Sequence, residues 1–261
     1  MIQRPLIKCL IIVFVFISFQ GLKLNAQQAL VATQASVKML AKMSPEEVIE
    51  ALRKPANSTG NIADAVETVT GARGWMSSDM KPIFEQKIVG RAWTSLLRPV
   101  LKTDGRNYPN YALQILDEAP AGSVLVYVLE DGLEIAGMGN LMATTASVRG
   151  LEGTVIDGAI RDVTEIRKIG HPVYARRISP ATSVGRLVSV SKQEPVVCAG
   201  VMVHPGDYIV GDNDGVVVVP FDAADEVVAL LADYDDKESK MVPIIQREKS
   251  MLKALEIYGR Y

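Results

Sequence analysis

Residues 137–177 read GMGNLMATTASVRGLEGTVIDGAIRDVTEIRKIGHPVYARR, and this stretch decides the fold. Glycines and a proline divide it into short segments whose hydrophobic spacing alternates between that of a helix and that of a strand. We expect helices over residues 141–148 and 163–169, and short strands over residues 153–156 and 172–175. Such an alternation is typical of an α/β domain.

The alternation continues on both sides of this stretch. Before it, Ser44 and Glu47 form a capping box that opens a helix, a second short helix covers residues 61–66, and a β-branched strand covers residues 123–129. After it, four strands precede a charged helical segment, and we expect them over residues 187–191, 196–203, 208–210 and 216–219, with the helical segment over residues 223–255.

These elements predict one α/β domain between two helical arms. The domain covers residues 58–222, the N-terminal arm residues 27–57 and the C-terminal arm residues 223–261. A length of 261 residues suits this organisation, because single domains and pairs of small domains both fall in that range.

The composition excludes several classes of protein. Hydrophobic residues make up 48% of the chain, which is enough for a buried core and excludes a wholly disordered protein. A formal net charge of −2 gives no general attraction to nucleic acid, and 6% aromatic residues are too few for stacking on single strands. The chain has two Cys and two His, and loss of one Cys by processing would exclude a four-ligand Cys/His zinc site.

The first 26 residues have the features of a secretory signal peptide. Arg4 and Lys8 flank the start of an apolar run over residues 9–19, which is short for a transmembrane helix, and Ala26 is a small residue at the expected cleavage site. Cleavage would make the protein periplasmic or secreted and, by removing three cations and no acidic residue, would change the formal net charge from −2 to −5. It would leave Cys198 without a cysteine partner in the chain. An uncleaved anchor is the alternative.

Gly139 and Asn140 stand just before a predicted helix. Asn is a favoured N-cap residue, and the amides of Leu141, Met142 and Ala143 would then face outward without helical partners. Free amides at the positive end of a helix dipole are a natural site for a carboxylate or phosphate.

Arg161 and Asp162 follow the predicted strand over residues 153–156, a position where α/β proteins collect functional groups. Arg161 can bind a carboxylate or an oxyanion through its guanidinium fork. Asp162 can hold a hard divalent cation whose other ligand positions are filled by water. An ion pair that starts the next helix explains the same two residues equally well.

This arrangement resembles the RraA-like family, which includes the class II 4-hydroxy-4-methyl-2-oxoglutarate aldolases and the regulator of ribonuclease activity A. In the aldolases an acidic residue after Gly is followed by 20 residues and then Arg-Asp; here Gly139-Asn140, residues 141–160 and Arg161-Asp162 have that spacing. The stretches STGNIADA (residues 58–65) and PGDYIVGDNDGVVVVP (residues 205–220) extend the resemblance. It implies an α/β/β/α sandwich of the swivelling β/β/α type, assembled as a homotrimer or hexamer with active sites between subunits.

The resemblance also implies a role for each residue of the site. Arg161 would bind the keto oxygen of a 2-oxo acid and stabilise its enolate, Asp162 would coordinate Mg²⁺ or Mn²⁺, and the amides of residues 141–143 would bind the substrate carboxylate. A Glu in the C-terminal helix of a neighbouring subunit would reach the waters on the metal, and Glu238 is the best match. Asn140 stands in place of the family's acidic residue, and an amide cannot accept a proton as a carboxylate does.

The resulting functional prediction is a divalent-metal-dependent lyase that cleaves 4-hydroxy-4-methyl-2-oxoglutarate-like 2-oxo acids to pyruvate. Decarboxylation of oxaloacetate would pass through the same enolate. Because of Asn140, two alternatives stay open: a non-catalytic binding or regulatory protein on the same scaffold, and a metal-dependent enzyme acting on another carboxylated substrate. Neither nucleic acid nor a membrane is an expected partner.

The remaining chemically active residues are expected to be structural. His171 and His204 each precede a proline in a turn, and Cys198 lies between apolar residues of the core. Asp212 belongs to a hairpin turn, and Asp157 to a turn that leaves a strand.

Overall fold

The computed structural model describes residues 42–101 and 105–259. Residues Ser44–Tyr261 form one compact unit, which contains every element of the predicted domain. The predicted signal peptide and the first part of the predicted N-terminal arm, together residues 1–41, lie outside the described residues. None of the helices in the described part is both long and apolar enough to cross a membrane.

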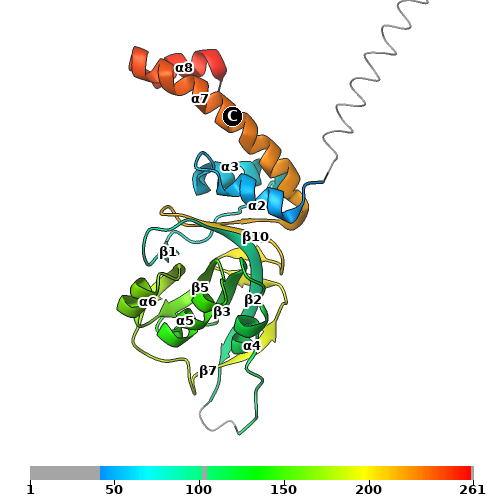
Figure 1. Cartoon of the computed structure of the whole chain (residues 1–261), viewed down its shortest axis with the longest axis vertical. Coiled ribbons are helices and arrows are strands. Elements are labelled where there is room, and N and C mark those ends of the chain that lie inside the picture. The colour runs from blue at the N-terminus through cyan, green and yellow to red at the C-terminus, as the bar shows by residue number, and fades with distance from the viewer. Residues whose placement is uncertain (1–41, 102–104, 260–261) are drawn as a thin grey trace, which may run out of the picture. The chain divides into compact units, whose positions relative to one another are not determined.

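Within the described residues, nine strands form one mixed sheet (Figure 1). Seven of them follow the order β1-β6-β5-β3-β2-β10-β11, while β4 pairs with β5 and β7 pairs with β2. The strands are β1 (Lys81–Pro82), β2 (Ile88–Pro99), β3 (Val124–Leu129), β4 (Ala136–Met138), β5 (Gly153–Ile160), β6 (Val173–Ile178), β7 (Leu187–Lys192), β10 (Tyr208–Gly211) and β11 (Val216–Val219). A separate hairpin is formed by β8 (Val196–Cys198) and β9 (Val201–Val203).

Five strands run in the same direction and bring their carboxyl ends to one edge of the sheet. Strands β2, β3, β5 and β6 pair in parallel, and β4 lies parallel to the end of β5, beyond the point where β3 stops. β2 is the longest of the described strands: its first part pairs with β10, its middle with β3, and its end with β7, and the last two pairings overlap. Because helices or other strands cover both faces, β3 and β5 are buried at nearly every position.

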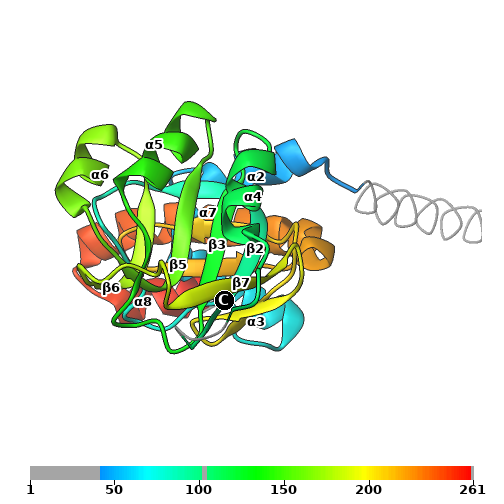
Figure 2. The same ribbon diagram turned by 90° about the horizontal axis from the view of Figure 1, so that it is seen from below.

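Seven α-helices complete the described part of the chain: α2 (Pro45–Arg53), α3 (Thr59–Thr70), α4 (Tyr111–Glu118), α5 (Asn140–Val148), α6 (Val163–Ile169), α7 (Ala224–Glu248) and α8 (Met251–Tyr258). Figure 2 shows α4, α5 and α6 together on one side of the parallel strands. The predicted capping box is confirmed at α2: Glu47 donates its amide to the Ser44 hydroxyl, and its carboxylate accepts from the Ser44 amide.

The parallel strands separate two hydrophobic cores. Ile156 of β5 packs with Ala143 of α5 and Ile166 of α6 in the core beneath the helices. Its neighbour Val155 points to the opposite face and packs with residues of β10 and of the β8–β9 hairpin, including Cys198. Adjacent residues of one strand therefore serve different cores, as the two-residue period of a β-strand requires.

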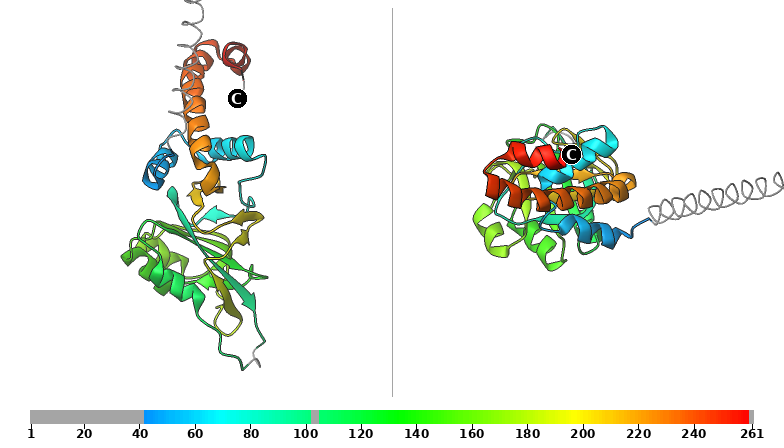
Figure 3. Two further views of the ribbon diagram at one scale, coloured as in Figure 1. Left: turned by 90° about the vertical axis from the view of Figure 1, so that its right-hand side faces the viewer. Right: turned by 90° about the horizontal axis from the view of Figure 1, so that it is seen from above.

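The C-terminal helices continue beyond this sheet. Figure 3 shows α7 running past α2 and α3, with α8 folding back beside it. Lys249 has a left-handed φ of 51° and ends α7, and the Ser250 hydroxyl accepts the Lys253 amide to begin α8.

The structure confirms the predicted α/β unit with helices at both ends, and it corrects one of the strands predicted after residue 180. Residues 196–203 do not form one strand, because Ala199 and Gly200 have positive φ angles of 45° and 88° and turn the chain between β8 and β9. Residues 223–255 are helical, as predicted, and Lys249 divides them between α7 and α8. The helices predicted over residues 141–148 and 163–169 agree with α5 and α6 to within one residue.

Candidate functional site

Two strand-to-helix junctions meet at the carboxyl edge of the sheet. The first runs from β4 into α5 through Gly139 and Asn140, and the second runs from β5 into α6 through Arg161 and Asp162. The Arg161 amide donates to the carbonyl oxygen of Met138 at 3.1 Å, which holds the two junctions side by side. The parallel pairing of β4 with β5 thus brings together residues that are some twenty positions apart in the sequence.

Asp162 is the centre of this cluster. It has a left-handed backbone, with φ 59° and ψ 35°, and its Oδ2 accepts the Asn140 amide at 3.1 Å. Arg161 Nε lies 3.7 Å from the same oxygen, and the side chains of Arg161 and Asp162 are 42% and 34% exposed. Within the described residues both polar contacts of this carboxylate involve Oδ2, so Oδ1 is left for a ligand.

Gly139 is required by this close packing. A Cβ atom at residue 139 would lie 2.6 Å from Asp162 Oδ2 and 3.1 Å from Arg161 Nε, closer than van der Waals contact permits. Its φ of −137° is accessible to any residue, so the restriction comes from space and not from backbone strain. A side chain at residue 139 would therefore require the Asp162 carboxylate to shift and would crowd Arg161.

The start of α5 differs from the prediction by one residue. Gly139, and not Asn140, is the N-cap, and Asn140 is the first helical residue with its amide bound to Asp162. Ala143 donates its amide to the Gly139 carbonyl at 3.1 Å and is therefore not available to a ligand. The first-turn amides of Leu141 and Met142 remain, and the Leu141 side chain is exposed.

Glu238, the predicted second metal residue, lies elsewhere in the chain. It is on α7, where its Oε2 is 3.4 Å from Asn61 Nδ2 of α3. Figures 1 and 3 both show α7 well apart from α5 and α6, so within one chain Glu238 does not join Asp162. The described residues contain no group of three or more His, Cys, Asp or Glu side chains placed to hold a metal ion.

An ion-pair network lies on the opposite face of the sheet, and the sequence did not indicate it. Asp157 was predicted to lie in a turn but lies inside β5. Its carboxylate accepts hydrogen bonds from the Ala199 amide at 2.6 Å and from Arg176 Nη1 at 2.9 Å. Arg176 Nε also contacts Asp79 at 3.0 Å. The network fastens the β8–β9 hairpin to the parallel strands. Alternation of Asp157 with the apolar residues of β5 was the one signal that could have revealed it.

Cys198 lies in the core and Asp212 in a hairpin turn, as expected, whereas His171 is a buried residue before β6. The Cys198 thiol is buried against Met76, and burial raises its pKa well above the ordinary value, which makes a poor nucleophile. His171 is buried with Nε2 2.9 Å from the Thr154 hydroxyl, and burial lowers its pKa to about 4. Asp212 lies in the β10–β11 turn and accepts the amide and hydroxyl of Thr59 at 2.8 and 2.6 Å.

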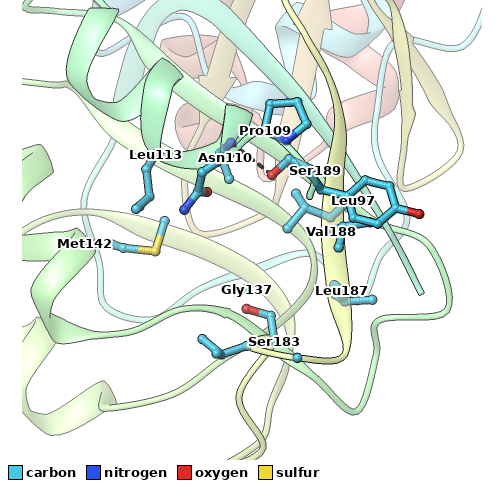
Figure 4. Close-up of a pocket in the computed structure, with 14 residues that line it drawn as sticks. Leu97, Pro109, Asn110, Leu113, Gly137, Met142, Ser183, Leu187, Val188 and Ser189 are labelled. Carbon is cyan, nitrogen blue, oxygen red and sulfur yellow. Dashed lines mark hydrogen bonds between the residues drawn. The ribbon is translucent and has the colours of Figure 1, made fainter. Parts of the chain in front are cut away.

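A pocket of about 310 Å³ is lined in part by Gly137 and Met142, which stand on either side of Gly139 and Asn140 in the sequence (Figure 4). Gly137 and Met142 form one side of it, the start of α4 forms another, and β7 forms a third. The described residues that line it are Leu97, Tyr108, Pro109, Asn110, Ala112, Leu113, Gly137, Met142, Ser183, Val184, Gly185, Leu187, Val188 and Ser189.

Known sequences resemble this chain over most of its described part. The family model of RraA-like proteins, described as Aldolase/RraA, matches residues 59–218. Protein DlpA of Legionella pneumophila is 34% identical over 174 residues, which are 66% of this chain but only 27% of DlpA. A protein of Halalkalibacterium halodurans with the provisional name 4-hydroxy-4-methyl-2-oxoglutarate aldolase is 33% identical over 164 residues, 61% of this chain and 70% of that protein.

Solved structures share the fold. An uncharacterized protein from Pseudomonas syringae pv. tomato is 26% identical with a TM-score of 0.74, and the match covers 83% of this chain and 96% of that one. Streptomyces coelicolor RraAS2, described as an unusual member of the RNase ES inhibitor RraA protein family, is 26% identical with a TM-score of 0.67 and coverages of 76% and 96%.

Proposed function

The chain belongs to the RraA-like family, and on this premise we propose that it is a divalent-metal-dependent lyase that cleaves 4-hydroxy-2-oxo acids, such as 4-hydroxy-4-methyl-2-oxoglutarate, to pyruvate. The observation that carries the proposal is the placement of Arg161 and Asp162 beside the first turn of α5. A guanidinium, a carboxylate and helix amides are together the groups that a 2-oxo acid and a hard cation require.

Asp162 suits a divalent cation such as Mg²⁺ or Mn²⁺. Its carboxylate is partly exposed, and Oδ1 is left for a ligand after the two described contacts at Oδ2. Mg²⁺ needs few protein ligands because it keeps several waters. A site with Asp162 as its one carboxylate from the described residues of this chain therefore suits Mg²⁺. Glu238 of a neighbouring subunit is the proposed additional partner. When bound, such a cation would polarise the keto group as a Lewis acid.

The residues of the chain then divide the remaining work. The amides of Leu141 and Met142 bind the substrate carboxylate, because they carry the positive end of the α5 dipole. Water takes the proton of the C4 hydroxyl group as the C3–C4 bond breaks, and the bonding electrons form the enolate of pyruvate. The Arg161 guanidinium contacts the keto oxygen and stabilises the negative charge that grows there. A proton from water then reaches C3 and gives pyruvate. Oxaloacetate would lose CO₂ through the same enolate and require the same residues.

One observation favours a second candidate function, that of a non-catalytic binding protein. Asn140 cannot accept the proton of the C4 hydroxyl group, and its own backbone amide is engaged by Asp162. A scaffold that binds a carboxylated ligand without cleaving it would keep all the other features of the site. A metal-dependent enzyme for another carboxylated substrate would keep them as well.

One assay separates these functions. Purified protein is incubated with 4-hydroxy-4-methyl-2-oxoglutarate and with oxaloacetate, in the presence of Mg²⁺, Mn²⁺ or a chelator, and pyruvate is measured. The lyase predicts metal-dependent release that Arg161→Gln reduces, whereas the exposed Arg167→Gln in α6 leaves it unchanged. Folded protein that binds Mn²⁺ but releases no pyruvate from either compound would exclude the lyase.

A further inference from the structure

We propose that Leu129, the last residue of β3, is a positioning residue of the candidate site. Its side chain holds β4 in place beside β5, and through β4 it sets the first turn of α5 against Arg161 and Asp162. Leu129 is 4% exposed and belongs to the hydrophobic core beneath the helices, so it acts through β4 and not by contact with a substrate. The effect on catalysis rests on the proposed lyase function, whereas the effect on the geometry of the site does not.

Leu129 lies where β5 changes its neighbour in the sheet. β3 pairs with β5 as far as Val128 and Asp157, and β4 pairs with β5 from Ala159 onwards. Gly158 is therefore the one residue of β5 between the two pairings, and Leu129 is the first residue of β3 beyond them. Because β4 is only three residues long, its own pairing with β5 is brief, and side-chain packing at this changeover has to help place it.

The side chain of Leu129 fills the space that side chains at Gly137 of β4 and Gly158 of β5 would need. A Cβ atom at residue 137 would lie 2.8 Å from Leu129 Cδ2 and 2.9 Å from Leu129 Cδ1. A Cβ atom at residue 158 would lie 3.0 Å from Leu129 Cδ2 and 3.1 Å from Leu129 Cβ. Neither glycine has a left-handed φ, so close packing and not backbone conformation accounts for both. One leucine thus packs against β4 and β5 together.

Two hydrogen bonds of the site join the same two segments a few residues further on. The Arg161 amide donates to the Met138 carbonyl at 3.1 Å. The Asn140 amide donates to Asp162 Oδ2 at 3.1 Å. Displacement of β4 by a clash or a void at Leu129 would lengthen both bonds and would move the amides of α5 relative to the Arg161 guanidinium. Groups that act on one substrate tolerate little displacement, so the rate falls with it.

A pair of compensating substitutions tests this role. Gly137→Ala adds a methyl group that meets the δ carbons of Leu129, and Leu129→Val removes both δ carbons while shortening the side chain by one carbon. The double variant conserves the total volume, which cores tolerate best. Gly158→Ala is the matched control, because its methyl group also meets Leu129 Cβ and, at 3.2 Å, the Gly132 carbonyl oxygen, and neither is removed by Leu129→Val.

The first reading is kcat/KM for pyruvate release from 4-hydroxy-4-methyl-2-oxoglutarate with Mg²⁺. We expect Gly137→Ala to lower it by roughly tenfold or more, and Leu129→Val to lower it by a smaller factor. The double variant Leu129→Val/Gly137→Ala should exceed both single variants and return to within about threefold of wild type, because the two sites are in contact and their effects do not add. Leu129→Val should bring no such recovery to Gly158→Ala.

The second reading is amide hydrogen exchange followed by NMR, which needs no catalysis. In Gly137→Ala the amides of Asn140 and Arg161 should exchange at least roughly tenfold faster than in wild type, and the double variant should restore their protection. The Thr154 amide donates to the Pro172 carbonyl at 2.9 Å at the opposite end of β5, and its exchange should not change. A general loosening of the fold would accelerate all three amides, so this comparison separates positioning from stability.

The two readings distinguish failure of this inference from failure of the lyase. Recovery of both activity and protection in the double variant supports both. Recovery of protection, with no pyruvate release even by wild type, overturns the lyase and leaves the positioning role of Leu129 standing. Exchange at Asn140 and Arg161 that Gly137→Ala leaves unchanged, that Leu129→Val fails to restore, or that Thr154 shares would overturn the inference. Gly137→Ala keeps the leucine core intact, so the first of these outcomes is readable even if the Leu129 variants do not fold.

Discussion

The backbone amide of Asn140 donates a hydrogen bond to Oδ2 of Asp162 at 3.1 Å, so the first turn of α5 fixes a carboxylate at the start of α6. This contact links the two junctions. The amide at the positive end of the α5 dipole stabilises the negative charge of Asp162, the N-cap residue of α6. It occupies Oδ2 and leaves Oδ1 of Asp162 for a ligand, as far as the described residues are concerned. The close packing of Gly139 against the same carboxylate makes the geometry sensitive to a single added methyl group.

Gly139→Ala should inactivate the protein without unfolding it. The added methyl group would lie 2.6 Å from Asp162 Oδ2, so the carboxylate or the helix must shift. A displacement of about an ångström at a reacting centre lowers rates by roughly 10²-fold. The measurement is kcat/KM for pyruvate release beside a thermal unfolding curve. Gly60→Ala is the control, because a Cβ there meets its nearest atom at an ordinary 3.5 Å; similar losses in both variants would refute the role of Gly139.

Asp162→Asn should weaken the binding of Mn²⁺ by at least roughly tenfold, since a neutral amide is a poorer ligand for a hard cation. Binding is measured by calorimetry or by the loss of the free Mn²⁺ resonance signal, without reference to activity. Asp131→Asn is the matched control, because Asp131 has a similar left-handed φ of 52° but lies outside the site. Equal affinity in wild type and Asp162→Asn would show that the cation binds elsewhere.

Asn140→Asp should raise both metal affinity and aldolase activity. A carboxylate at position 140 is a neighbour of Asp162, and the repulsion between the two is relieved when a cation binds. The new carboxylate can also accept a proton, which in general acid–base catalysis is worth roughly 10²-fold or more. The steady-state rate of pyruvate release measures the gain, and Asn213→Asp in the exposed β10–β11 turn is the control. A rate that stays the same or falls would argue against acid–base work at this position.

Local chemistry in the sequence was sufficient to place the helices around the site. Capping residues and glycines mark the ends of α2, α5 and α6, and β-branched runs mark β3 and β11. The strand β2 and the helix α4 were not predicted. In β2, charged and hydroxylated residues stand among apolar ones, and the strand is stabilised by pairing with three other strands. Such pairing is a tertiary effect that no local pattern expresses.

In the candidate site, too, local sequence patterns predicted some features and tertiary contacts determine the others. The spacing of Arg161 and Asp162 after an apolar strand indicated their location, and the resemblance to a family indicated their chemistry. The contact between Asn140 and Asp162 could not be predicted, because it depends on β4 taking a place beside β5 after β3 has ended. The one-residue error in the N-cap has the same origin, since Asp162 and not the Asn140 side chain accepts the first amide of α5.

Asp212→Ala should destabilise the fold by roughly 2 kcal/mol, whereas Asp214→Ala in the same turn should have little effect. Asp212 accepts the Thr59 amide at 2.8 Å and the Thr59 hydroxyl at 2.6 Å, and so fastens the start of α3 to the β10–β11 turn across 153 positions of the chain. Asp214 is exposed, and no such contact of its side chain is found in the described part of the structure. Urea unfolding of the three proteins measures the difference. Equal destabilisation would mean that the turn, and not the helix contact, determines stability.

The free energy of unfolding should decrease as the pH falls from 7 towards 4, because His171 is buried in its neutral form. Its ring is buried against the Thr154 hydroxyl, and burial lowers its pKa from 6.5 to about 4. Between pH 6.5 and pH 4 the unfolded chain binds a proton at His171 and the folded chain does not. The contribution of His171 to the free energy of unfolding is therefore fully present above the unfolded pKa. It is lost progressively below that pKa, by roughly 3 kcal/mol in total. Urea unfolding at pH 7.5 and pH 5 measures this loss in wild type and in His171→Gln, which cannot titrate but can still contact Thr154. Carboxylates contribute to both proteins alike, so the difference between them isolates His171, and His204→Gln, at the 60% exposed side chain of His204, should behave as wild type does. If His171→Gln lost as much stability as wild type between the two pH values, the buried imidazole would not be the group that titrates.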